Sequence, residues 1–247
     1  MKKLLQTLLL AVVLFASGNL FAQNNVYLNL GGALPLGDFA DGDDDDGCAL
    51  INEKMDEGGA GFGLNAGLKL KFGIWKGLGV IATMDGIYNG LNSEMRDLFE
   101  DVQDEMEEDA DDFTLRKPKY INVPLMVGAN YTHNFNSKFG VYGEFASGVN
   151  FRFITPFLME YEKEYSHEDY EFSLKYEYKP AVSFAWQLGA GIELANRITL
   201  GMSYYNLGSA KVEAKIKEKA TYNGESDSDS ENFKGKRVRP GWSARQF

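Results

Sequence analysis

A run of carboxylates near the N-terminus is the first candidate for metal chemistry. Residues 41–47 have the sequence DGDDDDG. Hard cations bind clustered carboxylate oxygens, and the ordered calcium loop also requires glycine at its sixth position. Counted from Asp41, that position holds Asp46 instead. Asp41, Asp43 and Asp45 are therefore candidates for loose binding of divalent cations only, and the alternative is a solvated, self-repelling acidic loop.

A second group, at residues 166–169, combines serine, histidine and two carboxylates in consecutive positions. A catalytic triad needs a histidine that contacts the serine on one side and a carboxylate on the other. Neighbouring residues of an extended chain point to opposite faces, so Ser166 and His167 are poorly placed to hydrogen-bond each other. This favours an ordinary loop histidine over a rim-sited lipid-modifying enzyme. We expect no enzyme activity, no catalytic residue and no cofactor.

A third group consists of single charges within otherwise apolar segments. Three are cations and three are anions: Lys69, Lys71, Asp85, Glu144, Arg152 and Glu193. Ionised groups that are buried must be paired or hydrogen-bonded. If all six share one enclosed face, they form an ion-pair network, with Arg152 and Glu144 as expected members. The alternative is a narrow wet cavity that these side chains merely line.

The segments that carry these charges alternate apolar with polar or small residues. In YINVPLMVGANYTH, which starts at Tyr120, every second residue from Ile121 is apolar or aromatic. Period two is the signature of a β-strand with two different faces, and runs of about ten residues can cross a bilayer at a tilt. Similar alternation occurs at residues 26–32, 62–72, 78–89, 139–153, 182–194 and 198–206.

The links between these segments alternate in length, which distinguishes a membrane barrel from a soluble one. Long links at 34–60 and 91–119 alternate with tight ones at 73–77, 134–138 and 195–197, a medium link covers 156–169, and a long acidic one covers 213–236. Outer-membrane barrels pair short periplasmic turns with long outer loops. The sequence therefore predicts an all-β, up-and-down antiparallel transmembrane barrel of about eight strands. A soluble β-sandwich or a lipocalin-like barrel is the alternative.

The closing strand is the least regular part of this prediction. It should lie between Lys236 and Phe247, where Pro240 and Gly241 interrupt the alternation. Proline cannot donate a hydrogen bond to a sheet, so we expect a short or irregular strand.

The N-terminus has the features of a secretory leader. Lys2 and Lys3 precede an apolar stretch at residues 4–15, and a small residue, Ala22, precedes Gln23. This pattern predicts a cleaved signal peptide at 1–22 and a barrel domain at 23–247, with a retained membrane anchor as the alternative. The single cysteine, Cys48, excludes an internal disulfide framework.

The charge of the chain is strongly negative and unevenly distributed. The formal net charge is −11, and the long links carry the excess of acid. Nucleic acid is excluded as a partner because phosphate binding needs a basic face.

Residues 93–108 have apolar residues at helical spacing, which predicts an amphipathic helix with Ser93 as its cap. We expect this helix to cover the barrel mouth, and partner binding is the alternative.

Several segments together resemble a known group of proteins. The leader ending LFAQ, the strands YINVPLMVGANY and GVYGEFASGVNF, and the terminal Phe247 are similar to outer-membrane β-barrel domain proteins common in Bacteroidetes. This group includes porin-family and PorT-like proteins and is related in architecture to the OmpX and OmpA barrels. The resemblance implies eight strands and residence in the outer membrane, and it supplies no shared catalytic residues.

The expected function follows from location more than from chemistry. We expect a non-enzymatic protein of the Gram-negative outer membrane whose acidic outer loops give it a structural or surface-interaction role. A narrow channel or a carrier for small solutes or amphiphiles is the second hypothesis, and a lipid-modifying enzyme is the third. Expected partners are outer-membrane lipid, the barrel-assembly machinery through Phe247, and a surface ligand or divalent cations at the acidic loops.

Overall fold

A computed structural model describes residues 24–40, 59–165, 168–195, 198–222 and 225–238. Among these residues the fold is all-β with one α-helix, and every strand pairs antiparallel with its neighbours. This confirms the all-β, antiparallel part of the prediction. Several segments named in the sequence analysis lie outside the described residues: the predicted signal peptide, residues 41–47, Ser166, His167 and Phe247.

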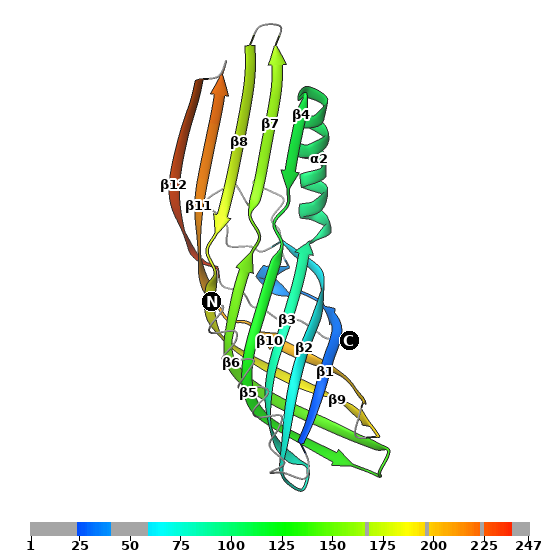
Figure 1. Cartoon of the computed structure of the whole chain (residues 1–247). Coiled ribbons are helices and arrows are strands. Elements are labelled where there is room, and N and C mark those ends of the chain that lie inside the picture. The colour runs from blue at the N-terminus through cyan, green and yellow to red at the C-terminus, as the bar shows by residue number, and fades with distance from the viewer. Residues whose placement is uncertain (1–23, 41–58, 166–167, 196–197, 223–224, 239–247) are drawn as a thin grey trace.

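Seven strands form one sheet that curls into a half-barrel (Figure 1). In sheet order the strands are β1 (Asn24–Ala33), β2 (Ala60–Trp75), β3 (Leu78–Leu91), β5 (Tyr120–Asn134), β6 (Phe139–Ile154), β9 (Ala181–Leu194) and β10 (Ile198–Asn206). Tight turns join β2 to β3 and β5 to β6 at one end of the sheet. At the β2–β3 turn, Lys76 and Gly77 both have positive φ, a conformation that glycine adopts without strain.

A second, five-stranded sheet extends from the other end of the half-barrel (Figure 1). In sheet order the strands are β12 (Glu225–Val238), β11 (Ala210–Tyr222), β8 (Glu168–Tyr178), β7 (Phe157–Tyr165) and β4 (Asp112–Arg116). Four of its strands, β4, β7, β8 and β11, adjoin strands of the seven-stranded sheet in the chain. The links predicted at 156–169 and 213–236 are therefore largely strands, a difference from the sequence expectation. The predicted closing strand begins within β12, and its residues 239–247 are outside the described part.

Prolines mark the junction between the two sheets. Pro118 separates β4 from β5, Pro156 separates β6 from β7, and Pro180 separates β8 from β9. Proline lacks the N–H that a central strand needs, so it occurs at bulges and strand ends. Across Pro156 and Pro180 the buried positions shift from even to odd numbers, as one extra residue at each junction requires.

The helix α2 (Ser93–Asp109) lies where the sequence predicted a helix, but its cap and its contacts differ from expectation. Its N-cap is Asn92, whose side chain accepts a hydrogen bond from the N–H of Met95. The helix stands beside the five-stranded sheet and not across the mouth of the half-barrel (Figure 1). The ring centroid of Phe99, on the helix, lies 5.8 Å from that of Phe157 on β7. The apolar face of this sheet needs a cover, and α2 provides it.

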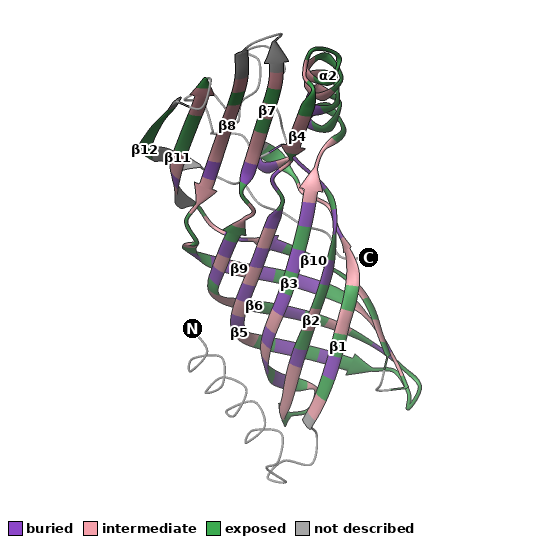
Figure 2. Cartoon of the chain, turned by 45° about the horizontal axis from the view of Figure 1, so that its top comes forward, coloured by how far each residue is buried: buried purple, intermediate pink, exposed green. Residues whose placement is uncertain are grey.

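Buried and exposed residues alternate along the strands of the seven-stranded sheet (Figure 2). The two sheets expose opposite kinds of side chain. On the seven-stranded sheet the exposed side chains are apolar and many buried ones are polar. Leu30 and Phe184 are 72% and 66% exposed, whereas Asn122 and Asp85 are 0% and 1% exposed. On the five-stranded sheet Phe157 and Tyr176 are buried. Among the described residues, no helix is both long and apolar enough to span a bilayer.

Candidate functional site

The buried polar face of the half-barrel is the candidate functional site, and an ion pair lies at its centre. Nζ of Lys69 on β2 lies 2.8 Å from both carboxylate oxygens of Glu144 on β6. The two side chains are 11% and 2% exposed. Gln187 of β9 donates to the same carboxylate at 3.4 Å. These contacts link β2 across the interior to β6 and β9, which are not its neighbours in the sheet.

A second pair lies toward the tight turns. Lys71 Nζ lies 3.3 Å from Glu193 Oε2 and donates to Thr132 Oγ1 at 2.8 Å. The hydroxyl of Tyr27 on β1 donates to Glu193 Oε1 at 3.3 Å. This carboxylate therefore links β1, β2 and β9, although β1 and β9 are not neighbours in the sheet.

Asp85 on β3 connects both edges of the seven-stranded sheet. It accepts hydrogen bonds from the Tyr205 hydroxyl on β10 at 3.3 Å and from Asn29 Nδ2 on β1 at 3.4 Å. Tyr205 is only 1% exposed. The curl of the sheet brings residues from its two edge strands to a single carboxylate.

Arg152 lies at the end of the interior nearest the proline junction. Its Nε donates to Asn122 Oδ1 at 3.4 Å, and its Nη2 donates to the carbonyl oxygen of Gly208 at 3.2 Å. Asn150 also donates to Asn122 Oδ1, at 3.0 Å. Arg152 and Glu144 were both expected in one ion-pair network; in the structure Glu144 pairs with Lys69, and Arg152 donates to Asn122 and Gly208.

All six charged residues predicted from the sequence therefore lie in this interior, and they are joined by residues outside the predicted set. Tyr27, Thr132 and Tyr205 supply hydroxyls that link the carboxylates and lysines. Each has the same alternation parity as the polar residues of its own strand, which is the signal that could have identified it. Within the described part of the chain, no further partner is present for Gln187 Oε1 and Asn130 Oδ1, and water is the usual partner of such buried atoms.

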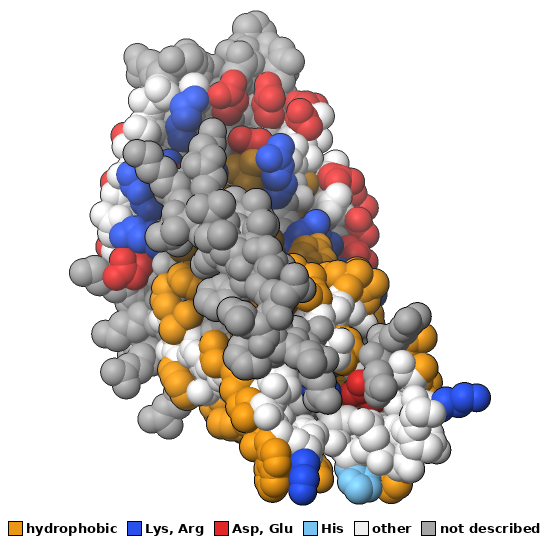
Figure 3. Space-filling model, turned by 60° about the horizontal axis from the view of Figure 1, so that its bottom comes forward, with side chains coloured by type: hydrophobic (Ala, Val, Ile, Leu, Met, Phe, Trp, Pro, Cys, Tyr) orange, Lys and Arg blue, Asp and Glu red, His pale blue; other side chains and the backbone are white. Residues whose placement is uncertain are grey.

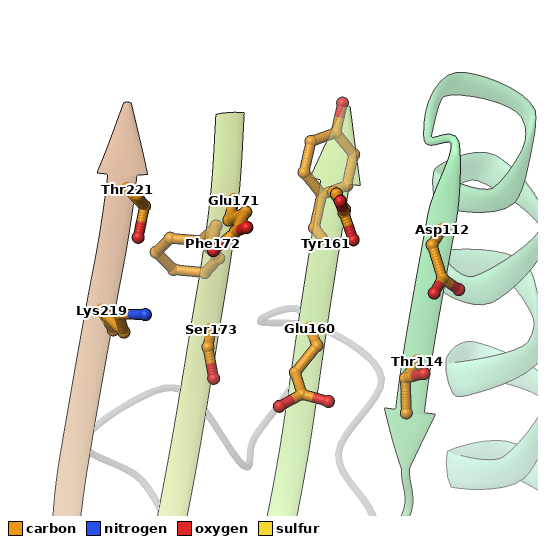
Figure 4. Close-up of a pocket in the computed structure, with 10 residues that line it drawn as sticks. Asp112, Thr114, Glu160, Tyr161, Glu171, Phe172, Ser173, Lys219 and Thr221 are labelled. Atoms are coloured by element: carbon orange, nitrogen blue, oxygen red, sulfur yellow. The ribbon is translucent and has the colours of Figure 1, made fainter. Parts of the chain in front are cut away.

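The outer sheet carries a second polar feature, an open hollow of about 360 Å³ (Figure 4). Asp112, Glu162 and Glu171 lie directly opposite one another on β4, β7 and β8. Like charges in opposite positions destabilise a sheet, so this row favours a surface that stays hydrated. The remaining lining residues are Thr114, Glu160, Tyr161, Phe172, Ser173, Lys219 and Thr221.

The metal and catalytic candidates from the sequence lie in segments that the structure does not describe. Asp41, Asp43, Asp45 and His167 are outside the described residues. In the part of the chain that is described, no three His, Cys, Asp or Glu side chains are grouped as metal ligands. The other histidine, His133, lies at the end of β5 and contacts the ring of Phe135 edge-on at 4.8 Å.

Comparisons with known proteins add no identification. No protein-family model, no curated protein and no solved structure matches this chain. Function must therefore be argued from the arrangement of the residues themselves.

Proposed function

We propose that this chain is a non-enzymatic β-barrel of the Gram-negative outer membrane with a filled interior and a water-exposed outer sheet. The observation that carries the proposal is the reversed polarity of the seven-stranded sheet. Its exposed face bears large apolar side chains on every strand, such as Leu28, Val127, Phe145, Phe184 and Leu200. A soluble sheet would bury this face, whereas lipid is its natural solvent.

The proposed barrel is closed by an eighth strand between the free edges of β1 and β10. Open sheet edges do not occur in the hydrocarbon region, because unpaired N–H and C=O groups cost several kcal/mol each. Tyr27 on β1 and Tyr205 on β10 already bond across the interior to Glu193 and Asp85. These contacts support a curl that is close to closure.

Export and assembly form part of the same proposal. Residues 1–22 are a cleaved signal peptide, and the five-stranded sheet with α2 points away from the cell. Phe247 is recognised by the barrel-assembly machinery, and lipid of the outer membrane surrounds the exposed apolar face. The tight turns then face the periplasm, as short turns do in such barrels.

The interior is proposed to be a plug rather than a pore. An eight-stranded barrel has room only for its own side chains. The paired charges of Lys69 with Glu144 and of Lys71 with Glu193, together with Arg152, occupy that room. A role in envelope structure or surface interaction follows, in which the acidic outer part meets cations or a basic partner. The exposed acids of α2 include Glu94, Asp97, Glu100, Asp101, Asp104, Glu105, Glu107, Glu108 and Asp109.

Single-channel conductance of the refolded chain tests this proposal. A heat-dependent gel shift first establishes that a barrel has formed in lipid. We expect a folded barrel without steady conductance. Steady conductance would support instead the narrow channel or carrier, and a chain that shows no gel shift and does not enter lipid would contradict the membrane assignment.

A further inference from the structure

One face of the five-stranded sheet carries a band of cations between the acidic hollow and the seven-stranded sheet. On four neighbouring strands Arg116, Leu158, Lys175 and Lys217 lie directly opposite one another. Lys215 flanks this row on β11 and has the same alternation parity as Lys217. We call the four cations the basic collar: Arg116, Lys175, Lys215 and Lys217.

The collar has more positive charge than its neighbouring carboxylates neutralise. Lys175 and Lys217 share one carboxylate, Glu177, at 2.9 and 2.8 Å. Glu213, an acid on the same face of β11 as Lys217, pairs with Lys179 at 2.9 Å. Opposed like charges destabilise a sheet, so a bound anion would stabilise this arrangement. The lysines are accessible, since the side chains of Lys175 and Lys217 are 40% and 45% exposed.

The collar lies on the side of the sheet that continues the exposed face of the half-barrel. The other side packs against α2, and Leu91 contacts both that cluster and the interior cluster of the half-barrel. The inner surfaces of the two sheets are therefore continuous, and so are the outer ones. Figure 3 shows Lys and Arg side chains between the apolar surface of the half-barrel and acidic side chains at the far end.

The height of the collar matches the headgroup layer of a membrane. From Phe153, an exposed apolar residue of β6, to Leu158 the extended chain spans at most about 16 Å. Strands of membrane barrels tilt by about 35–45°, so the distance along the membrane normal is smaller. Leu158 places an aliphatic side chain within the row of cations. Beyond the collar, the carboxylates of Glu160, Glu162 and Glu171 repel anions and limit the site on its outer side.

We propose that the basic collar binds phosphate groups of anionic lipid headgroups in the leaflet that surrounds the outer end of the barrel. This inference rests on the proposed membrane location. The collar supplies cations at headgroup depth next to an apolar surface, a combination that fits an amphiphile with a phosphorylated head. Basic groups next to an anionic membrane surface contribute to lipid binding individually.

The test compares lipid selectivity in the refolded full chain. Spin-labelled phosphatidic acid and spin-labelled phosphatidylcholine compete for the protein in phosphatidylcholine vesicles at low salt. We expect a preference of about fivefold for phosphatidic acid. The variant Lys175→Gln/Lys217→Gln should reduce this preference to within about twofold.

Lys117→Gln/Lys163→Gln is the matched control, because it removes two charges on the helix side of the sheet, where these lysines pair with Glu100 and Asp109. The control should keep the preference for phosphatidic acid. Equal loss in both double variants would overturn the collar proposal, since net charge alone would then explain the selectivity.

Two further outcomes separate the possible failures. Inorganic phosphate should compete no better than chloride at equal ionic strength, and stronger competition would overturn a lipid headgroup as the ligand. A chain that enters neutral vesicles, judged by the gel shift, but shows no headgroup preference overturns the collar alone. A chain that does not enter neutral vesicles overturns the proposed function as well.

Discussion

The two sheets of this protein are built largely from the same stretches of chain, yet their polarity is reversed. In the seven-stranded sheet Phe184 is exposed and Gln187, on the opposite face of β9, is buried. In the five-stranded sheet Tyr176 is buried under α2. Glu177, the next residue, lies on the opposite face and pairs there with two lysines. The change occurs at Pro118, Pro156 and Pro180.

Alternation alone therefore does not identify the environment of a strand. Period two requires two different faces, but burial decides which face is the inner one. The half-barrel encloses its polar face, and the outer sheet covers its apolar face with α2. We infer that the proline line marks the boundary between a lipid environment and water.

The largest expected effect on stability comes from breaking an ion pair, and it should differ between the buried pairs of the half-barrel and the exposed pairs of the outer sheet. Lys69→Met should destabilise the half-barrel by about 3–5 kcal/mol, because it leaves the buried carboxylate of Glu144 without its cation. Lys179→Met removes an exposed pair with Glu213 in the outer part and should cost at most about 1 kcal/mol. Urea unfolding in lipid, followed by tryptophan fluorescence, measures both.

The double variant Lys69→Met/Glu144→Gln serves as control for that experiment. It removes both charges, so it should recover much of the loss seen for Lys69→Met. Equal unfolding midpoints for the wild type and Lys69→Met would contradict the role of the interior pair.

An arginine introduced on the exposed face should lower stability much more in the seven-stranded sheet than in the five-stranded sheet. Leu188 is 53% exposed on β9, and Leu188→Arg should cost about 2–4 kcal/mol if this face contacts the middle of a bilayer. Ser226→Arg, at an exposed position of β12 opposite Thr221, should change stability by no more than about 0.5 kcal/mol. Similar small effects of both variants on the gel shift and the unfolding midpoint would argue against a lipid-facing half-barrel.

Arg152 tests the boundary between the sheets. Arg152→Ala removes donors to Asn122 and to the carbonyl of Gly208, next to the start of β11. Hydrogen bonds to charged groups contribute about 1.5–3 kcal/mol each, so thermal unfolding should begin at a lower temperature. An unchanged thermal profile would contradict a plug held by this network.

The smallest effect is expected for an exposed group of the outer sheet. Hydrogen bonds from Lys217 and Lys175 lower the pKa of Glu177 from 4.5 to about 2. The stabilisation is therefore complete above pH 4.5 and is lost as the pH falls through 2. The difference in unfolding midpoint between the wild type and Glu177→Gln should be small, equal at neutral pH and pH 5, and absent at the acid end. A difference that disappears by pH 5 would contradict this pairing.

Much of the half-barrel could be predicted from the sequence because its alternation is regular. The outer sheet was harder to recognise. β7 and β8 also alternate, but their many charges resemble those of a solvated loop, as in YEKEY at residues 161–165. The signal that was available is the set of three prolines, each placed between two alternating stretches.

The interior charges could be predicted as a set, but their partners could not. Lys69 and Glu144 are 75 positions apart, and their contact depends on how far the sheet curls. Tyr205 and Asp85, 120 positions apart, depend on the same curl. Periodicity predicts which face of a strand a residue lies on. Its partner across the interior depends on the diameter of the half-barrel, which the local sequence does not encode.

The most direct test of the account is the depth of two nitroxide labels in lipid. The labels are attached at Leu188→Cys on β9 and, separately, at Ser228→Cys on β12, each with Cys48→Ser to remove the native thiol. We predict that the label at 188 collides mainly with oxygen, which is concentrated in lipid, and the label at 228 mainly with a water-soluble nickel chelate. Equal access of the nickel chelate to both labels in a folded, lipid-reconstituted chain would contradict the division of this protein between membrane and water.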